Sequence, residues 1–225
     1  MRIGKIDYLN LLPFEVFMKA FPVSLQTKAV MAYKKSYPSK LNRDFLFGRL
    51  DGGFLSSIMA CGQGKIALPC GIIADGEVWS VLALPNPNKK DYQSASSNAL
   101  IQVLGIEGEV LIGDRALIYK MSGGEGIDLG QRWKEKKGLP FVFGLFCVSK
   151  QKQRAEKIIL KFAQAKVKIP QYILQKASQK SGVAKKDIVR YLEKIQYRIG
   201  CKEKRALEVF YRELLFHKIK KPKRF

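Results

Sequence analysis

The N-terminal stretch of the chain constrains the fold most strongly, because it joins a short apolar strand to a polar turn. Residues 2–6 predict a buried strand, which stops at the turn 8–10 before Pro13. In an open α/β sheet, the loops at the carboxyl ends of the strands form the ligand crevice. Proline suits the first turn of a helix, where its missing N–H leaves nothing unpaired. We therefore expect a strand, a turn that presents Tyr8 and Asn10 to a ligand, and then a helix.

Two roles are open for Asn10. Its carboxamide both donates and accepts hydrogen bonds, as a group that orients a substrate must. Asparagine is also common at helix N-caps, so the alternative is that Asn10 only caps the helix that follows. The residue types alone favour the cap.

Short apolar strands and helical patterns alternate through the rest of the chain. Residues 23–31 are predicted to be extended, and further strands are expected at 53–58, 78–84, 109–114 and 141–148. After these strands, apolar residues at a 3.6-residue spacing predict a helical C-terminal third. Such an alternation is typical of α/β proteins.

The chain is expected to cross twice between two lobes. Residues 85–90 are rich in Pro and Asn and mark the first crossing, and the strand 141–148 marks the return. The predicted organisation is a discontinuous lobe 1 over 1–86 and 149–225, with lobe 2 over 87–148. Two lobes with a cleft between them are suited to trapping a ligand.

Charge and hydropathy narrow the classes of protein. The chain carries a formal net charge of +22, and residues 150–225 hold 23 Lys and Arg against six Asp and Glu. This balance would suit a nucleic-acid partner, but the basic residues alternate with helical apolar positions, which predicts solvated helix faces and no nucleic-acid site. No apolar run approaches the roughly 20 residues that span a bilayer, and no secretory signal precedes the first strand. We expect a cytoplasmic protein without membrane contact.

Cysteine and histidine are too sparse for metal or triad chemistry. The four cysteines are scattered through the chain, and the only histidine is His217. A zinc site needs about four clustered ligands, and no such spacing is present. We expect reduced thiols packed as small hydrophobic residues at Cys61, Cys70, Cys147 and Cys201.

Several blocks, taken in order, resemble the chorismate dehydratases of the futalosine route to menaquinone. They cover nearly the whole chain and are found at 2–13, 48–57, 75–81, 111–117, 128–134, 138–144 and 191–198. Two departures stand out: the segment 84–113 is shorter than usual, and the family's Ser-x-Thr-Ser motif is Ser94-Ala95-Ser96-Ser97 here.

The resemblance implies a two-lobed, periplasmic-binding-protein-like α/β fold used as an enzyme, with chorismate between the lobes. The reaction would be that of a carbon–oxygen lyase, which removes water from chorismate to give 3-[(1-carboxyvinyl)oxy]benzoate. Because the ring becomes aromatic, no cofactor or metal is expected. Two alternatives are an enzyme of the same pathway that forms 1,4-dihydroxy-6-naphthoate, and a non-catalytic protein that binds a small anion.

The expected site joins this resemblance to the residue chemistry. Asn10 and Ser80 are predicted to act in catalysis, and the predicted substrate-binding residues are Tyr8, Ser56, Ser96, Ser97 and Asp114. Asparagine cannot take a proton at neutral pH, so the hypothesis is a substrate-assisted elimination, in which the enolpyruvyl carboxylate removes the ring proton.

Two of these assignments have structural alternatives. Ser96 and Ser97 precede a predicted helix, so they either bind a carboxylate at its positive end or cap it. Asp114 is a general base if burial raises its pKa, or the N-cap of a helix that begins at Arg115. Trp133 and the pair Phe141 and Phe143 are expected in the core or at the lobe interface.

Overall fold

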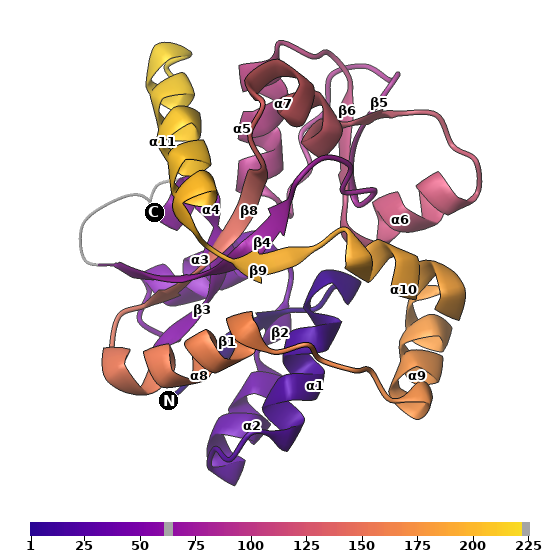
Figure 1. Cartoon of the computed structure of the whole chain (residues 1–225). Helices are drawn as coiled ribbons and strands as arrows, with labels where there is room; N and C mark the ends of the chain where they lie inside the picture. Colours follow the sequence, from indigo (N-terminus) through magenta and orange to yellow (C-terminus); the bar gives the residue numbers. More distant parts are fainter. Residues whose placement is uncertain (61–64, 222–225) are drawn as a thin grey trace.

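The computed structural model describes residues 1–60 and 65–221, and within them the strands form two sheets (Figure 1). The larger sheet has the order β2-β1-β3-β8-β4-β9, and the smaller sheet has the order β6-β5-β7. The strands are β1 (Ile3–Ile6), β2 (Lys35–Ser36), β3 (Gly52–Ser56), β4 (Ile66–Ala74), β5 (Val81–Leu84), β6 (Glu109–Ile112), β7 (Ile127–Asp128), β8 (Phe141–Val148) and β9 (Gln196–Arg198).

Helices cover both sheets (Figure 1). A short 3-10 helix, η1 (Leu9–Leu11), follows β1. The α-helices are α1 (Leu12–Ala20), α2 (Leu25–Tyr33), α3 (Pro38–Leu46), α4 (Ser57–Ala60), α5 (Ala95–Leu104), α6 (Gly113–Met121), α7 (Leu129–Lys137), α8 (Lys152–Gln164), α9 (Gln171–Ser181), α10 (Lys185–Glu193) and α11 (Cys201–Phe216).

The carboxyl ends of β1 and β3 lie at the same edge of the larger sheet. β1 pairs with β2 and β3 in parallel. The close approach of β1 to β3 depends on Gly53, because a Cβ there would lie 2.8 Å from the carbonyl oxygen of Gly4. The turn with Asn10 and the end of β3 at Ser56 therefore face the same side, as expected for a ligand crevice.

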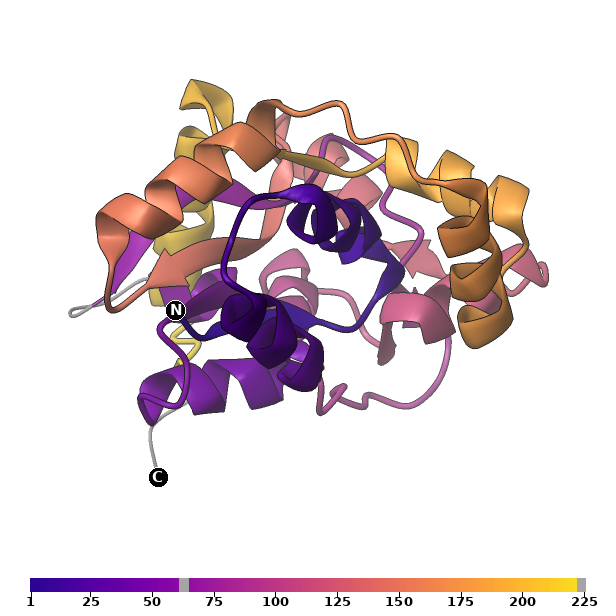
Figure 2. The same ribbon diagram turned by 90° about the horizontal axis from the view of Figure 1, so that it is seen from below.

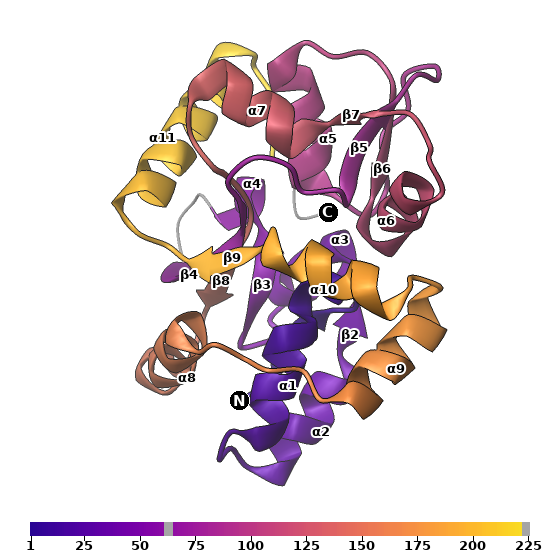
Figure 3. The same cartoon turned by 45° about the vertical axis from the view of Figure 1, so that its right-hand side comes forward.

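The other strands of the larger sheet are antiparallel, so this sheet is mixed. β8 pairs with both β3 and β4, and β4 pairs with β9. Figure 3 shows the smaller sheet with α5, α6 and α7 in the upper part of the molecule, and β2 with α1 and α2 in the lower part. The predicted two-lobed α/β architecture is confirmed.

The crossings between the lobes occur at other residues than predicted. β5 belongs to the smaller sheet although it falls within the predicted lobe 1 (1–86), and β8 belongs to the larger sheet although it falls within the predicted lobe 2 (87–148). The chain leaves the larger sheet after β4, and the segment 85–90 is a loop between β5 and α5. Pro and Asn are common in any loop that follows a strand, whether it stays inside a lobe or crosses between lobes. The Pro and Asn residues at 85–90 therefore do not locate the boundary between the lobes.

Residues 23–31 are mostly helical, and the prediction of an extended segment is wrong. The hydroxyl of Ser24 accepts the N–H of Thr27 at 3.3 Å and so caps the N-terminus of α2. Only Thr27 and Met31 of this helix are buried. A helix with so narrow a buried face leaves little 3.6-residue periodicity in the sequence.

The C-terminal segment connects the two lobes. In Figure 3, α10 lies between the upper and lower parts, and Figures 1 and 2 show α9 and α10 as a pair on one side of the molecule. α11 packs against β8 and α5. The rings of Trp133, Phe141 and Phe210 meet edge to face with centroids 5.0 to 6.0 Å apart. Trp133 and Phe141 are core residues, as predicted.

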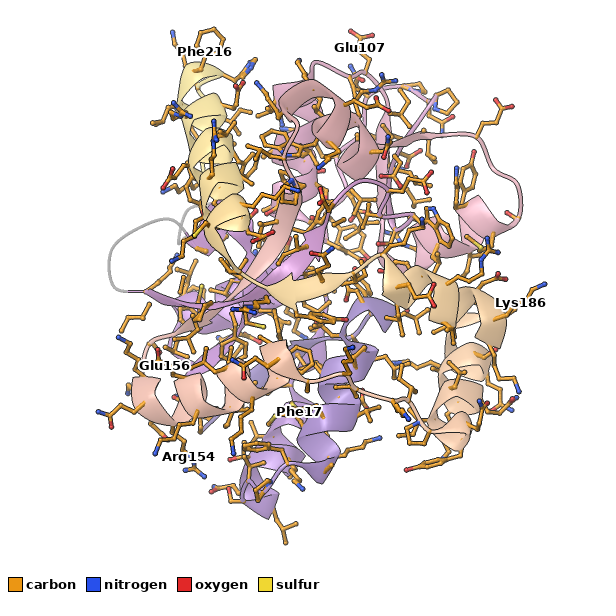
Figure 4. The ribbon with its side chains drawn as sticks, in the orientation of Figure 1. Phe17, Glu107, Arg154, Glu156, Lys186 and Phe216 are labelled. Atoms are coloured by element: carbon orange, nitrogen blue, oxygen red, sulfur yellow. The ribbon has the colours of Figure 1, made fainter. Side chains whose placement is uncertain are left out.

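The basic residues of the C-terminal third lie on the solvent faces of their helices. Arg154 of α8 and Lys186 of α10 project outward (Figure 4) and are exposed. On the same helices, Ile158 and Ile188 are buried. The predicted solvated faces are confirmed for these helices. In the part of the chain that the structure covers, no helix has the length and apolar character needed to cross a membrane.

The cysteines only partly follow the prediction. Cys70 and Cys147 are buried, whereas Cys201 is exposed, because α11 buries a different face through Ala206 and Phe210. Cys61 lies outside the described residues. Across 1–60 and 65–221, no three His, Cys, Asp or Glu side chains are grouped to hold a metal ion.

Candidate active site

A cavity lies where the carboxyl ends of β1 and β3 face the smaller lobe. Part of this cavity is open to solvent. Its polar lining residues are Tyr8, Asn10, Ser56, Ser80, Ser94 and Ser97, and among the described residues that line it none is charged. The cavity therefore offers neutral hydrogen-bonding groups on mainly apolar walls.

Asn10 reaches this cavity from η1. The helix that follows has Leu11 at its N-cap and no side-chain cap, so the alternative that Asn10 caps the helix is wrong. The hydroxyl of Tyr197 donates to the Asn10 carbonyl at 2.6 Å and fixes the backbone. Side-chain Oδ1 is buried without a hydrogen-bond partner in the described structure. Such an acceptor costs about 1–3 kcal/mol, which a ligand that donates a hydrogen bond would recover.

Tyr8 packs on the backbone of Gly113 across the lobe interface. A Cβ on Gly113 would lie 2.8 Å from Cζ of the Tyr8 ring, so only glycine permits this contact. The Tyr8 hydroxyl donates to Oε1 of Gln93. Burial raises the pKa of Tyr8 far above its ordinary value, so the phenol stays neutral at physiological pH. Tyr8 thus joins β1, α6 and the loop before α5 at the cavity wall.

Ser80 lines the cavity directly before β5 begins. The predicted strand 78–84 is formed only over 81–84, because Trp79 adopts a left-handed conformation with φ of 60°. The carboxylate of Asp128 accepts the N–H groups of Val78 and Trp79 at 3.0 and 2.7 Å. These hydrogen bonds fix the turn before Ser80. The hydroxyl of Tyr191 donates to Ser80 Oγ at 2.9 Å.

Ser56, at the end of β3, shares two hydrogen bonds with one side chain of α3. Its N–H donates to Asn42 Oδ1 at 3.0 Å, and Asn42 Nδ2 donates to Ser56 Oγ at 2.8 Å. Both residues are buried. The predicted binding residue Ser56 therefore lines the cavity in a fixed orientation.

The serine motif spans the N-terminus of α5, and its serine side chains do not all line the cavity. Ser94 is the N-cap, and its Oγ accepts the N–H of Ser97 at 3.2 Å. Ser97 lines the cavity, as predicted for a binding residue. Ser96 is absent from that lining and its Oγ lies 2.9 Å from Oγ of Ser57. The structure thus adds Ser94 to the wall and turns Ser96 away from it.

Asp114 lies next to the cavity but not on its wall. Its Oδ1 accepts the N–H of Leu9 at 2.9 Å, and it sits inside the first turn of α6, with Ile112 at the N-cap. The predicted N-cap role is therefore wrong. Burial raises the pKa of Asp114 to about 6, and the hydrogen bond from Leu9 opposes this shift. The raised pKa suits a general base, but the position favours a structural tie between η1 and α6.

The N-termini of three helices converge on the cavity. Pro38 begins α3, Ser97 lies in the first turn of α5, and Gly113 begins α6, and all three line the cavity. Helix N-termini carry a positive partial charge and favour anions. The neutral wall is therefore suited to an anionic ligand.

Four contributors to the site were not predicted as such: Asn42, Ser94, Gly113 and Tyr191. Ser94 has a local signal, because a serine directly before an apolar helix is a typical N-cap. Asn42 and Tyr191 act across long sequence distances from within helices, where a polar residue in an amphipathic pattern predicts nothing specific.

Comparison with known proteins decides the family. A family model described as menaquinone biosynthesis matches residues 87–214. The protein named chorismate dehydratase from Campylobacter jejuni subsp. jejuni serotype O:23/36 (strain 81-176) is 44% identical over 213 residues, which are 93% of this chain and 96% of that protein. The chain belongs to the menaquinone biosynthesis family. This membership agrees with the resemblance found in the sequence blocks.

Solved structures show which fold this family member has. AF1704 from Archaeoglobus fulgidus superimposes with a TM-score of 0.73 at 14% identity, over 97% of this chain and 98% of that one. The CA3427 gene product of Candida albicans, described as exhibiting the generic periplasmic binding protein structural fold, gives a TM-score of 0.54 at 11% identity, over 98% and 90% of the two chains. The predicted periplasmic-binding-protein-like fold is confirmed.

Proposed function

We propose that this protein is a chorismate dehydratase, a hydro-lyase that converts chorismate to 3-[(1-carboxyvinyl)oxy]benzoate and water. The proposal is supported by the 44% identical relative of that name, which matches 93% of the chain. The structural observation that carries it is the unpartnered Oδ1 of Asn10 in a cavity of neutral groups. Chorismate presents two carboxylates, which are acceptors, and one ring hydroxyl, which is a donor.

The binding mode follows from that complementarity. The positive ends of α3, α5 and α6 and the serine hydroxyls meet the carboxylates, while Asn10 Oδ1 accepts the hydrogen of the ring hydroxyl. The formal net charge of +22 raises the encounter rate with a dianion. Tyr8 forms part of the cavity wall. Asp114 stabilises η1 by accepting the N–H of Leu9.

The reaction needs no strong base from the protein. The enolpyruvyl carboxylate of the bound substrate takes the ring proton, the C–H electron pair becomes part of the aromatic ring, and the C–O bond to the ring hydroxyl breaks. The carboxylic acid formed in this way gives the proton to the departing hydroxide, so that water leaves and the carboxylate is restored. Asn10 and Ser80 hold the reacting groups in contact, and such orientation contributes roughly 7–11 kcal/mol to intramolecular reactions. Aromatisation supplies the driving force, so we propose that the reaction uses neither cofactor nor metal. Because the family belongs to menaquinone biosynthesis, we propose that the enzyme acts in the cytoplasm.

A single incubation tests the function. Purified protein is mixed with chorismate, and the product is separated by liquid chromatography against synthetic 3-[(1-carboxyvinyl)oxy]benzoate. A chorismate dehydratase converts the substrate in many turnovers. A protein that leaves chorismate unchanged contradicts the proposal and favours an enzyme that forms 1,4-dihydroxy-6-naphthoate or a binding protein for a small anion.

A further inference from the structure

Three serine hydroxyls at the cavity have partners that occupy their oxygen atoms as acceptors. We propose that these partners are positioning residues, which turn the three hydroxyl hydrogens toward the ligand and make the cavity a preset array of donors. This inference rests on the proposed function only for the identity of the natural ligand. The pairs are Asn42 with Ser56, Tyr191 with Ser80, and Ser94 with Ser97.

The orientation of Ser56 is fixed by the amide of Asn42. Because Asn42 Oδ1 accepts the backbone N–H of Ser56, the amide cannot be flipped without losing that bond. Its Nδ2 therefore faces Ser56 Oγ at 2.8 Å and can only donate. The single hydrogen of the Ser56 hydroxyl remains available for the ligand.

Ser80 receives its hydrogen bond from a tyrosine of α10. Tyr191 is 1% exposed, and burial raises its pKa well above the ordinary value, so its hydroxyl keeps its proton. That hydroxyl donates to Ser80 Oγ. Since one lone pair of Ser80 is thus occupied, its own hydrogen is free to point into the cavity.

Ser97 is oriented by its neighbour at the helix cap. Ser94 Oγ accepts the Ser97 N–H and gives its own hydrogen to Ser97 Oγ at 2.8 Å. The hydroxyl of Ser97 then donates elsewhere, and the cavity is beside it. Residues of three separate elements, α3, α10 and the start of α5, thus each leave a serine hydroxyl as a hydrogen-bond donor.

A cavity lined by hydrogen-bond donors favours ligands that carry acceptors. A carboxylate can accept a hydrogen bond from all three hydroxyls, whereas an amide NH₂ group at the same place is itself a donor and forms no hydrogen bond with them. Sites whose buried polar groups are left unpaired by a wrong ligand discriminate strongly against it. Because the hydroxyls are oriented before the ligand arrives, little reorganisation is required when charge moves during the reaction.

The test is a double-mutant cycle between Tyr191→Phe and Ser80→Ala. Binding of isophthalate, a planar aromatic dianion that cannot be dehydrated, is measured by calorimetry, with the neutral isophthalamide as a comparison ligand. Tyr211→Phe is the matched control, because its hydroxyl donates to the Ser57 carbonyl and it is not among the cavity-lining residues. Unfolding midpoints and KM and kcat for chorismate are recorded for each variant.

Tyr191→Phe is expected to weaken isophthalate binding about fivefold. The ratio of the isophthalate affinity to the isophthalamide affinity should fall as well. In the Ser80→Ala background the same change should alter binding less than twofold, because the hydroxyl it orients is gone. An equal loss in both backgrounds, or a loss matched by Tyr211→Phe, would overturn the inference. So would a wild-type protein that does not prefer isophthalate to isophthalamide. Failure of the proposed function appears separately, as chorismate left intact while these ratios hold.

Discussion

The contact between Gly113 and Tyr8 yields a prediction whose size can be worked out from the structure. Gly113 has φ of +66°, and a Cβ there would lie 2.8 to 2.9 Å from three atoms of the Tyr8 ring. Gly105 has nearly the same conformation, φ of +65°, but a Cβ there would meet nothing within 4 Å. The two sites therefore share the backbone strain and differ in the collision.

Both alanine variants lose about 1–2 kcal/mol of unfolding free energy from the left-handed backbone. Gly113→Ala loses about 1–3 kcal/mol more, because the rigid Tyr8 ring must move. Its kcat/KM for chorismate should fall at least about tenfold, since an ångström of displacement at a site is that costly. Gly105→Ala should keep wild-type turnover. Denaturant unfolding and turnover measure these values, and equal losses in the two variants would refute the reasoning.

Two further predictions concern partly buried carboxylates. Burial opposes ionisation of Glu15, but contacts with Lys5 at 2.7 Å and Lys35 at 3.1 Å hold its pKa at about 2. Glu15→Gln leaves the buried Lys5 without its counter-ion and should cost about 3 kcal/mol of unfolding free energy at pH 7; a loss below about 1 kcal/mol would contradict this. Asp114 has a pKa raised to about 6 by burial, so the folded state binds its proton more tightly than the unfolded state, and stability should fall as pH rises from about 4 to 6. Asp114→Asn keeps an acceptor for the Leu9 N–H, so it should abolish that pH dependence and retain kcat within about threefold; a collapse of kcat in a folded variant would identify Asp114 as the base.

The sequence predicted the parts of the site that depend on local order. The strand over 2–6, the turn with Asn10 and the helix after Pro13 are found as expected, because the apolar run and the proline act on neighbouring residues. The hydroxyl at Ser56 was found for the same reason, since β3 ends there.

The rest of the site depends on tertiary contacts that leave no local pattern. Asp128 holds the turn before Ser80 through hydrogen bonds to residues 49 and 50 positions earlier, so the apolar run from Val78 forms a shorter strand than predicted. Likewise the hydroxyl of Tyr191 reaches Ser80 across 111 residues. Neither partner is distinguishable from an ordinary cap or core residue until the chain is folded.

The most direct test of the proposed mechanism compares Asn10→Ala with the wild type in two measurements on the same samples. We predict that kcat for chorismate falls by about two orders of magnitude or more, because the ring hydroxyl loses the group that orients it. The unfolding free energy should stay equal or rise by about 1 kcal/mol, because a buried acceptor without a partner has been removed. Full turnover by this variant would contradict the central role of Asn10.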